Sequence, residues 1–522
     1  MQTQEIAIKS NVRVLLKADS EMLDEVIVVA YGTAKKSSFT GSVSNVSGDK
    51  IAKMQTSNVS KSLEGAMAGV QISQSSGQPG SSADIYVRGI GSISANRKAL
   101  IVVDGVPYEG NLNQIAPGDI ESMTVLKDAA ANSLYGARGA NGVVLITTKR
   151  GKNGKVKVTF ENRTGVNMRG VPSYDVLTNE GEYYELYWEA MRNNAYASGQ
   201  SYLAAGQYAS ADLVSTLGGY NSYNVADAEL IDPITGRLNA NAKLKYHDNW
   251  LDEAFRPAMR QENAISLSGG TDKTSYYASI GYLYDNAYTV NSNMDRINAR
   301  VKVDQEVNDW FKAGFNLAYS NVKTNSPNVG SSSYSSIFFF GQQVAPIYPV
   351  YMYDKDGNKV YDASGNVRYD YGTEMGKRPI GANVHPIDQQ LNNIYKGTVD
   401  VINAKAYADF TFLTDFKLTI NASIDNFNTR TVSFQTPIGG DALNVNGRGT
   451  TEMERYYVLN ANQLLNWAHT YKGVHNVEVL LGHETKQDRV ENVWARKENF
   501  LVPSNPELDN AAKLSDASSS AA

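Results

Sequence analysis

The sequence predicts a mixed fold, in which a small α/β domain is followed by the antiparallel strands of a transmembrane β-barrel. The stretch from Asp119 to Arg150 has the pattern of a strand, a helix, a tight turn and a strand, packed into a compact unit. Beyond Lys155, amphipathic strands follow one another, and their connections alternate between very short and long. The stretch is therefore interpreted as the joint between the two parts.

The predicted strands are each roughly 10 to 18 residues long, close to or above the length that crosses a bilayer at a tilt. In one of them, Tyr276, Ile280 and Tyr284 share one face, and Ser279 and Gly281 lie on the other. One face is thus suited to lipid and the other to a lumen. About nine strands are predicted, near residues 156–167, 260–270, 274–285, 294–306, 311–322, 397–412, 416–429, 452–469 and 475–489. The polar end of the chain, KLSDASSSAA, is interpreted as a ragged or artificial stop.

The connections between these strands carry the most information. Tight turns at TDKT, VNDW, LTD and YKGVH join successive pairs of strands. Short turns on one side and long loops on the other are typical of an outer-membrane barrel with periplasmic turns and external loops. The long loops are predicted at residues 168–259, 286–293, 323–396 and 430–451.

Composition excludes several classes of protein. A net charge of −5 over 522 residues gives no basic surface, so nucleic acid is not expected as a partner. The chain has no cysteine, which excludes disulfide scaffolds and thiolate metal sites. It has 32 tyrosines, which suit strands at a membrane interface and carbohydrate-binding surfaces equally well. Composition therefore leaves both of these interpretations open.

The N-terminal region contains a second informative stretch. Residues 4–16 are predicted to form the last hairpin of a β domain. Next comes an acidic pair and an apolar run, followed by the linker-like segment AKKSSFTGS. An ordinary buried strand is one reading of the run, but its flanks favour an extended strand that pairs with the sheet edge of a partner. The stretch consists of Asp24, Glu25, Val26, Ile27, Val28, Val29, Ala30, Tyr31 and Gly32.

Residues 41–150 have short and mixed elements. Residues 57–68 are predicted to form a helix, and VQIS, ADIYVRG, KALIVVDGVPY and ESMTVLKD are predicted to form strands. Asp104 is expected to cap the turn that it forms with Gly105. Arg88, beside Gly89 at the end of a strand, is expected to be solvated or to form a salt bridge.

No catalytic, cofactor or metal site is predicted. The five histidines lack metal-ligand spacing, and no nucleophile elbow or phosphate-binding loop occurs. Asp354 to Asn358 resemble the start of a calcium loop, but Lys359 stands where that loop needs glycine and Gly365 where it needs glutamate. A hairpin in YMYDKDGNKVYD explains these residues better. The chain is therefore not expected to be an enzyme.

Five motifs in sequence order resemble the SusC/RagA-like TonB-dependent transporters of the Gram-negative outer membrane. They are DEVIVVAYG, SLEGAMAGVQI, IYVRGIGSI, ALIVVDGVPY and DIESMTVLKDAAANSLYGARGANGVVLITTKRGK. The resemblance implies that residues 1–20 end an immunoglobulin-like extension, and that residues 21–33 hold the TonB box, Asp24 to Gly32, and a linker. Residues 34–150 would be the plug, and residues 151–522 the N-terminal part of the barrel. The plug motif residues would be Arg88, Gly89, Asp104, Gly105, Tyr135, Gly136, Arg138 and Gly139, with the glycines in packing and turn roles.

The family barrel has 22 strands and a plugged lumen. About nine strands cannot close such a barrel, so we expect the chain to be the N-terminal part of a longer transporter, without signal peptide and remaining strands. A complete small barrel fits poorly, because its interior would already be filled by side chains.

The resemblance implies active import of an oligosaccharide or peptide across the outer membrane, driven by the TonB complex through the TonB box. A SusD-like lipoprotein would be a further partner, and outer-membrane lipid would surround the wall. A surface glycan-binding protein without transport is the alternative, and a passive porin is a third possibility that the plug argues against. The loops that would select the substrate have too little pattern to identify it.

Overall fold

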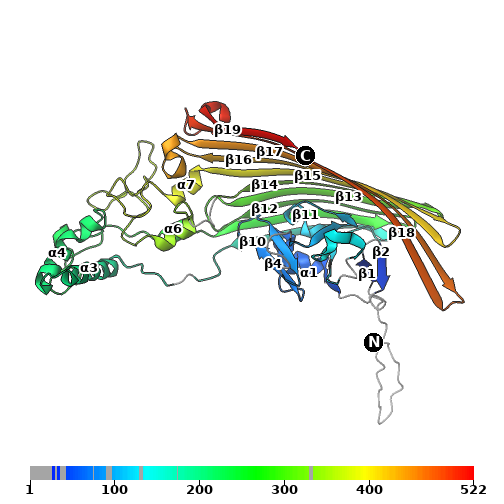
Figure 1. The fold of residues 1–522 in the computed structure, drawn as a ribbon, viewed down its shortest axis with the longest axis horizontal. Coiled ribbons are helices and arrows are strands. Elements are labelled where there is room, and N and C mark those ends of the chain that lie inside the picture. The colour runs from blue at the N-terminus through cyan, green and yellow to red at the C-terminus, as the bar shows by residue number, and fades with distance from the viewer. Residues whose placement is uncertain are drawn as a thin grey trace, which may run out of the picture.

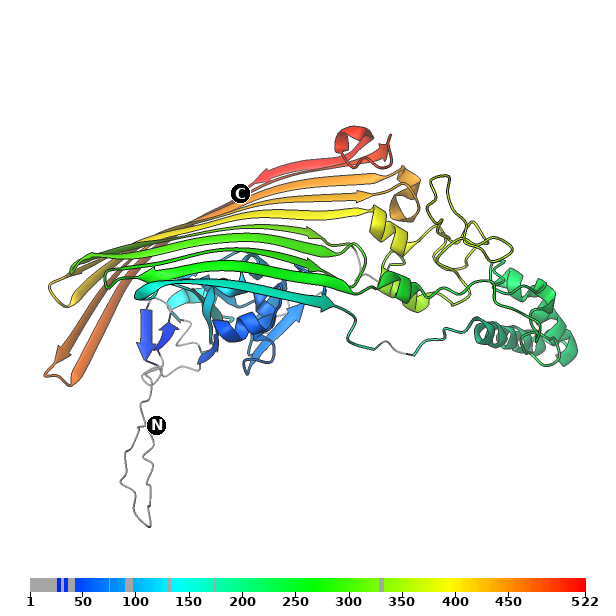
Figure 2. The same cartoon turned by 180° about the vertical axis from the view of Figure 1, so that it is seen from behind.

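The structure is an arched sheet with an α/β domain beneath its concave face (Figure 1). A group of helices and loops lies beyond one end of the strands, and the first described strands of the chain, Val26–Val29 and Gly32–Lys35, lie toward the other end (Figure 2). The structure is a computed structural model, and it describes residues 26–29, 32–35, 43–74, 76–89, 97–128, 133–172, 175–327 and 333–522. The hairpin predicted for residues 4–16 lies outside these residues.

The arched sheet has ten strands, and each pairs antiparallel with the next along the chain. All nine predicted strands are confirmed. The tenth, β19, is missing from the prediction because its small polar residues show no apolar alternation; it is a strand through its backbone pairing with β18, so the chain end is not ragged. The strands are β10 (Gly154–Asn167), β11 (Ala258–Gly270), β12 (Thr274–Asn286), β13 (Asn293–Asn308), β14 (Phe311–Asn325), β15 (Ile394–Phe412), β16 (Phe416–Gln435), β17 (Arg448–Tyr471), β18 (His475–Phe500) and β19 (Ala511–Ala521).

The two faces of the sheet differ as predicted. In β12, Tyr277 and Ser279 donate hydrogen bonds to Asp119 of the α/β domain. Ile280 and Tyr282, on the opposite face of the same strand, are 57% and 41% exposed. Because side chains alternate along a strand, the concave face meets the α/β domain and the convex face carries the exposed apolar residues.

The connections alternate in length as predicted, but the long ones are not simple loops. Those between β10 and β11 and between β14 and β15 fold together into a module beyond one end of the strands, here called the external module for this position, whose core includes Trp188, Leu213, Tyr220 and Ile347. No helix in the described part of the chain is long and apolar enough to cross a membrane. The helices of the module are α3 (Glu180–Ala197), α4 (Tyr202–Thr216), α5 (Trp250–Ala254), α6 (Ile337–Gln343) and α7 (Pro386–Asn392).

The residues around Asp354 form a hairpin, as predicted. The N–H of Asp354 donates to the carbonyl of Asn358, and the Asp354 carboxylate accepts from the N–H groups of Asp356 and Asn358. Tyr353 and Lys359 pair across this turn. The carboxylate is thus occupied by its own backbone.

The α/β domain contains a five-stranded sheet in the order β3-β8-β9-β6-β7 and a separate hairpin of β4 and β5. Its buried core includes Ile51, Leu63, Met123 and Val144. The strands are β3 (Val43–Ser47), β4 (Val70–Gln74), β5 (Ala83–Val87), β6 (Leu100–Val103), β7 (Val106–Pro107), β8 (Ile120–Leu126) and β9 (Val143–Thr148). The helices are α1 (Gly48–Lys53) and the 3-10 helices η2 (Val59–Leu63), η3 (Leu112–Gln114), η4 (Pro117–Asp119) and η5 (Ser133–Gly139).

The predicted order of strand, helix, turn and strand after Asp119 is confirmed by β8, η5 and β9. The prediction of a helix over residues 57–68 is wrong. Only the short 3-10 helix η2 forms there, and Asn58 caps it by accepting from the N–H of Ser60. Gly65 and Gly69 follow with φ of 65° and 72°, which ends helical structure there.

Helix α7 links the external module to the rim of the arched sheet, where Gln390 donates to the carbonyl of Val290, between β12 and β13, at 2.5 Å. His385 is fully buried and caps this helix: its Nδ1 accepts from the N–H of Asp388, and its Nε2 lies 2.9 Å from the carbonyl oxygen of Val350. These contacts require a neutral ring with its proton on Nε2. Burial, with a smaller effect of the Arg378 charge, lowers the pKa of His385 to about 3.

We predict that His385→Asn destabilises α7 by about 1 to 3 kcal/mol at pH 7.5, because the Val350 carbonyl loses its donor. The folded pKa of His385 lies below its ordinary value of 6.5, so its stabilisation is present above pH 6.5 and is lost as the pH falls toward 3. The difference between wild type and variant should shrink by about 1.4 kcal/mol per pH unit below pH 6.

Hydrogen exchange of the α7 amides at pH 7.5, 6 and 5 measures this difference. Burial raises the pKa values of the neighbouring Asp370 and Asp388, so these two groups make the folded state more stable as the pH falls. This trend is opposite to that of His385, and because it is present in both proteins, the comparison with wild type removes it. His475→Asn, at an exposed position, is the control. A difference that does not change with pH would contradict the proposed role of the neutral ring.

Candidate functional site

The candidate site is the interface between the α/β domain and the concave face of the arched sheet. β13 presents a row of polar side chains to this interface, because every second residue of a strand faces the same side. Arg296, Asn298 and Arg300 of this row are buried, and Lys302 follows them. A buried cation needs a hydrogen-bond acceptor or an anion beside it, so the α/β domain has to supply carboxylates or carbonyl oxygens opposite this row.

Asp104 is the centre of an inner cluster, which we define as Asp104, Asp119, Arg300, Lys302 and Lys405. Its carboxylate accepts from the N–H of Thr148 at 2.9 Å and from Nδ2 of Asn316 in β14 at 2.8 Å. Nζ of Lys302 and Nη1 of Arg300 lie 3.6 and 3.8 Å from Oδ2.

The prediction that Asp104 simply caps its turn is therefore wrong. Asp104 and Gly105 do form a tight turn, with φ of 48° and 84°. The carboxylate, however, binds Thr148 and the wall, and Lys405 of β15 donates to the backbone carbonyl of Asp104 at 2.5 Å. The turn places one carboxylate and one carbonyl against three cations of the wall.

Asp119 completes the inner cluster at the end of η4. Its Oδ1 accepts from the Tyr277 hydroxyl at 2.9 Å and from the Ser279 hydroxyl at 2.7 Å. Nε of Arg300 lies 3.9 Å from Oδ2. Arg300 thus lies between two carboxylates of the α/β domain, and this compensates a charge that is almost fully buried.

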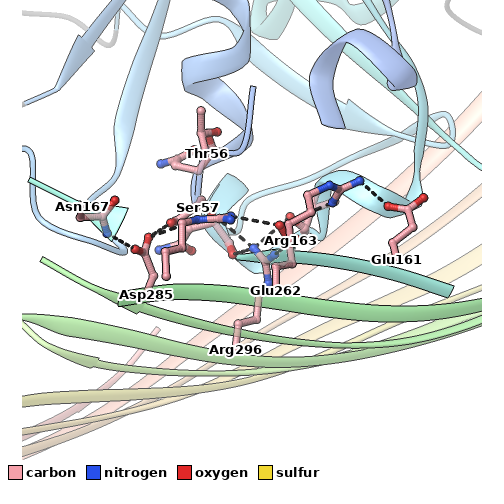
Figure 3. Close-up of polar contacts among 12 residues, drawn as sticks. Thr56, Ser57, Glu161, Arg163, Asn167, Glu262, Asp285 and Arg296 are labelled. Atoms are coloured by element: carbon pink, nitrogen blue, oxygen red, sulfur yellow. Dashed lines mark hydrogen bonds and ion pairs between the residues drawn. The ribbon is translucent and has the colours of Figure 1, made fainter. Parts of the chain in front are cut away.

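Arg296 is the centre of an outer cluster, nearer to the external module, which we define as Ser57, Arg163, Glu262, Asp285 and Arg296 (Figure 3). Its side chain is 1% exposed, and Nη1 lies 2.8 Å from the carbonyl oxygen of Asn113. The carbonyl oxygens of Ser57 and Ile115 follow at 3.3 and 3.4 Å. One arginine of the wall thereby binds three backbone carbonyls of the α/β domain.

The acids of the outer cluster come from the wall itself. Glu262 of β11 pairs with Arg260 at 3.0 Å, with Arg163 at 3.5 Å and with Arg296 at 3.8 Å. Asp285 of β12 accepts from the hydroxyl of Ser57 and from Nδ2 of Asn167 (Figure 3). The cluster therefore ties two segments of the α/β domain to four strands of the wall.

Two ion pairs join the α/β domain to β18. Lys486 lies 2.9 Å from Glu109, and Arg138 lies 3.0 Å from Glu484. Arg138 was expected in the motif of the α/β domain, and the structure places it at the wall. Its side chain is 39% exposed, so screening by water reduces what this pair contributes to stability.

The other predicted motif residues have local roles. Arg88 forms a salt bridge with Asp128, as expected, and Arg88 and Gly89 turn the chain with φ of 59° and 94°. Tyr135 is buried beside Leu145 in a small core. Gly136 bends η5 with φ of 58°, and the carbonyl of Gly139 accepts from the N–H of Gly142.

Of the stretch from Asp24 to Gly32, the structure describes Val26–Val29 and Gly32. Asp24, Glu25, Ala30 and Tyr31 lie outside the described residues. Val26–Val29 form β1, which pairs antiparallel with β2 (Gly32–Lys35). An extended strand at this position agrees with the prediction, whereas its partner protein stays a prediction.

Sequence reasoning missed the wall residues of both clusters. Arg296, Arg300 and Lys302 are spaced by four and two residues in NMDRINARVKVD, which places all three on one face of the predicted strand. This row of positive charge is the signal that could have revealed them. No group of three or more histidine, aspartate and glutamate side chains in the described ranges is arranged to hold a metal ion.

The interface also contains space. One small cavity is lined by Asp119, Tyr277 and Arg296, and another by Asp104, Lys405 and Asp425. Polar groups and cavities lie side by side, so the α/β domain is held chiefly by contacts that water can replace.

We predict that Arg296→Met loosens the α/β domain by about 3 to 5 kcal/mol, because Glu262 and three backbone carbonyls lose a buried cation. Hydrogen exchange of residues 57–63 and 112–119 in the full chain should accelerate, while the β15–β17 amides stay protected. Arg368→Met, in an exposed loop of the external module, is the control. Unchanged exchange at residues 57–63 would show that Arg296 does not hold this domain.

Comparison with known proteins agrees with this architecture. The family model described as TonB-dependent Receptor Plug Domain matches residues 35–143. The chain is 30% identical over 437 residues to TonB-dependent receptor SusC of Bacteroides thetaiotaomicron, which covers 80% of the chain and 38% of that relative. It is 28% identical over 515 residues to TonB-dependent receptor P3 of Formosa agariphila, which covers 96% of the chain and 44% of that relative. The chain thus spans less than half the length of these relatives.

Solved structures give the same result. The RagAB peptide importer in its open-open state superposes with a TM-score of 0.73 at 25% identity, over 95% of this chain and 53% of that one. The FpvAI–pyocin S2 complex, at 10% identity and a TM-score of 0.50, shares the fold alone. The α/β domain is a plug, the arched sheet is barrel wall, and the chain belongs to the SusC-like family of TonB-dependent receptors, which are β-barrel proteins of the outer membrane.

Proposed function

We propose that this protein imports a large nutrient, an oligosaccharide or a peptide, across the outer membrane, with energy supplied by the TonB complex. The observation that carries the proposal is the nature of the plug interface. Arg296, Arg300 and Lys302 hold the plug through hydrogen bonds and ion pairs. Among the described residues, the wall adds Val401 and Phe427 to the buried core of the plug, and Val399 and Tyr456 pack against that core at half-buried positions.

This chemistry suits a plug that moves. Breaking an apolar interface exposes hydrocarbon surface to water, which costs free energy in proportion to the area. A polar group that leaves its protein partner can instead bind water, so the net cost of each hydrogen bond is small. A plug held by polar contacts can therefore be displaced while the wall, with its continuous backbone pairing, stays intact.

The proposed handle is the stretch from Asp24 to Gly32. The described part of it is extended and leads toward β3, which lies at the edge of the five-stranded sheet. An edge strand has a partner on one side only, so once β1 and β2 have separated, a pull from the N-terminal side meets a single strand pair of that sheet, β3 with β8. Binding of the TonB complex to this stretch would follow the mode in which a strand is added to a partner.

The cargo and the second partner also belong to this proposal. RagAB is a peptide importer, which favours a peptide, and the tyrosine-rich external module is equally suited to stack on sugars. A SusD-like lipoprotein is proposed as the lid over the external module.

Deletion of residues 24–32 tests the energy coupling. We expect uptake by cells to be lost, while ligand binding to the purified protein stays unchanged, because the external side and the plug interface are not altered. Deletion of residues 2–10 removes the same number of residues upstream and should leave uptake unchanged.

Val28→Pro is a sharper variant, because it removes one backbone donor from the strand without shortening the chain. It should reduce uptake as the deletion does. Normal uptake by both variants would contradict the proposed role of this stretch, and would favour a surface glycan-binding protein or a passive channel.

A further inference from the structure

The convex face of the wall carries an apolar band across four neighbouring strands, β14 to β17. The concave positions of these strands are identified by their plug contacts, such as Asn316 and Lys405 with Asp104. The alternate positions are therefore convex, and Leu317, Ile424 and Leu459 there are 45%, 41% and 41% exposed. A continuous exposed apolar band of this kind is the surface that faces lipid in a barrel.

Aromatic rings mark the edge of the band at the short turns. Phe311 stacks on Phe410 with ring centroids 5.1 Å apart, and Phe412 stacks on Phe416 at 5.6 Å. Trp467 lies opposite Phe416 in the strand register. Aromatic girdles lie at the interface between hydrocarbon and headgroups.

Four cations mark the opposite edge of the band, next to the long connections. They are Lys323 of β14, Lys396 of β15, Arg430 of β16 and Arg455 of β17, here called the rim cations. All four are exposed. Each continues the convex series of its strand: Lys323 follows Leu317 and Tyr319, and Arg430 follows Ile420 and Ile424 at even spacing.

The strand register places the rim cations close together. Lys323 and Arg430 both lie opposite Thr398, one on each side of it. Lys396 lies two residues from Thr398, and Arg455 lies opposite Asn428, two residues from Arg430. With strands about 4.8 Å apart and residues about 3.3 Å apart, neighbouring rim cations are roughly 7 to 10 Å from one another.

No carboxylate forms a salt bridge with a rim cation in the described part of the chain. Acids on the same face are occupied otherwise: Asp400 accepts from the Tyr319 hydroxyl at 2.7 Å and from Asn321 at 2.8 Å. Asp295 lies opposite Lys323 and accepts from the Tyr282 hydroxyl at 3.0 Å. Glu491 lies opposite Arg455 and pairs with Arg489 of its own strand at 2.9 Å. Arg455 lies over the ring of Tyr457. The rim cations and Arg489 together outnumber the three acids on this part of the convex face, so the border of the apolar band keeps a net positive charge there.

We propose that the rim cations bind the phosphate-bearing headgroups of anionic lipids in the outer leaflet. Phosphate groups of a bilayer lie where the apolar band ends, and the long stems of lysine and arginine allow their charges to reach that level. Arginine offers several N–H donors to one phosphate, and lysine adds a mobile point charge. A lipid phosphate between Lys323 and Arg430 would be met by cations from both sides.

Native mass spectrometry of the full-length protein, released from detergent micelles, tests the proposal. The probes are phosphatidylglycerol, whose headgroup is anionic, and phosphatidylcholine, whose headgroup is neutral overall. We expect wild-type protein to retain phosphatidylglycerol in preference. The variant with Lys323→Gln, Lys396→Gln, Arg430→Gln and Arg455→Gln should retain about tenfold less, since each cation contributes to the attraction.

The control variant removes cations from exposed positions of the external module, with Lys243→Gln, Lys355→Gln and Lys377→Gln. It should retain phosphatidylglycerol as wild type does. Equal loss in both variants, equal retention in all three proteins, or complete displacement by inorganic phosphate would overturn the lipid site.

A pair of single variants keeps the proposal testable if the fourfold variant does not fold. Arg430→Lys preserves the charge and should keep most of the retained phosphatidylglycerol, whereas Arg430→Gln should reduce it. Equal retention by these two variants would also overturn the site. Uptake does not enter this test, so its outcome is independent of the proposed transport function.

Discussion

The structure depends on one constraint: within hydrocarbon, each backbone N–H and C=O group of the wall has to find its partner in the sheet. The pairing of β11 with β12 and of β14 through β18 accordingly runs without a register shift. The shifts that do occur, as at Glu306 in β13 and Arg496 in β18, lie near strand ends. Continuous register then assigns every side chain of the wall to one of two faces.

This assignment links the wall to the plug. The side chains of Arg296, Arg300 and Lys302 cannot face lipid, and a buried cation without acceptors is unstable. The plug supplies the acceptors as carboxylates at Asp104 and Asp119 and as carbonyls of Ser57, Asn113 and Ile115. The wall in turn provides the only side chains that neutralise these plug carboxylates among the described residues. Each part therefore stabilises the other.

The sequence was sufficient for the features that repeat. Alternation at Tyr276 to Tyr284 predicted a two-faced strand, because period two is visible in one segment alone. β19 could not be predicted, since its pairing depends on β18 and not on its own side chains. The role of Asp104 was missed for a related reason: a turn is a local property, whereas its contacts with Arg300 and Lys405 join residues some 200 to 300 positions apart.

The stretch from Asp119 to Arg150 shows how close the two parts are. The N–H of Lys149 donates to the carbonyl of Asp119, which closes the unit on itself. A Cβ at Gly151 would lie 2.3 Å from the backbone nitrogen of Tyr276, so only glycine lets the chain pass from the plug into β10 there. The C-terminal end of the plug is thus covalently and sterically fixed to the wall. Its other wall contacts are chiefly polar, and Val399, Val401, Phe427 and Tyr456 are the apolar exceptions. The displacement proposed above would therefore begin on the N-terminal side of the plug, where the chain enters through β1 and β3.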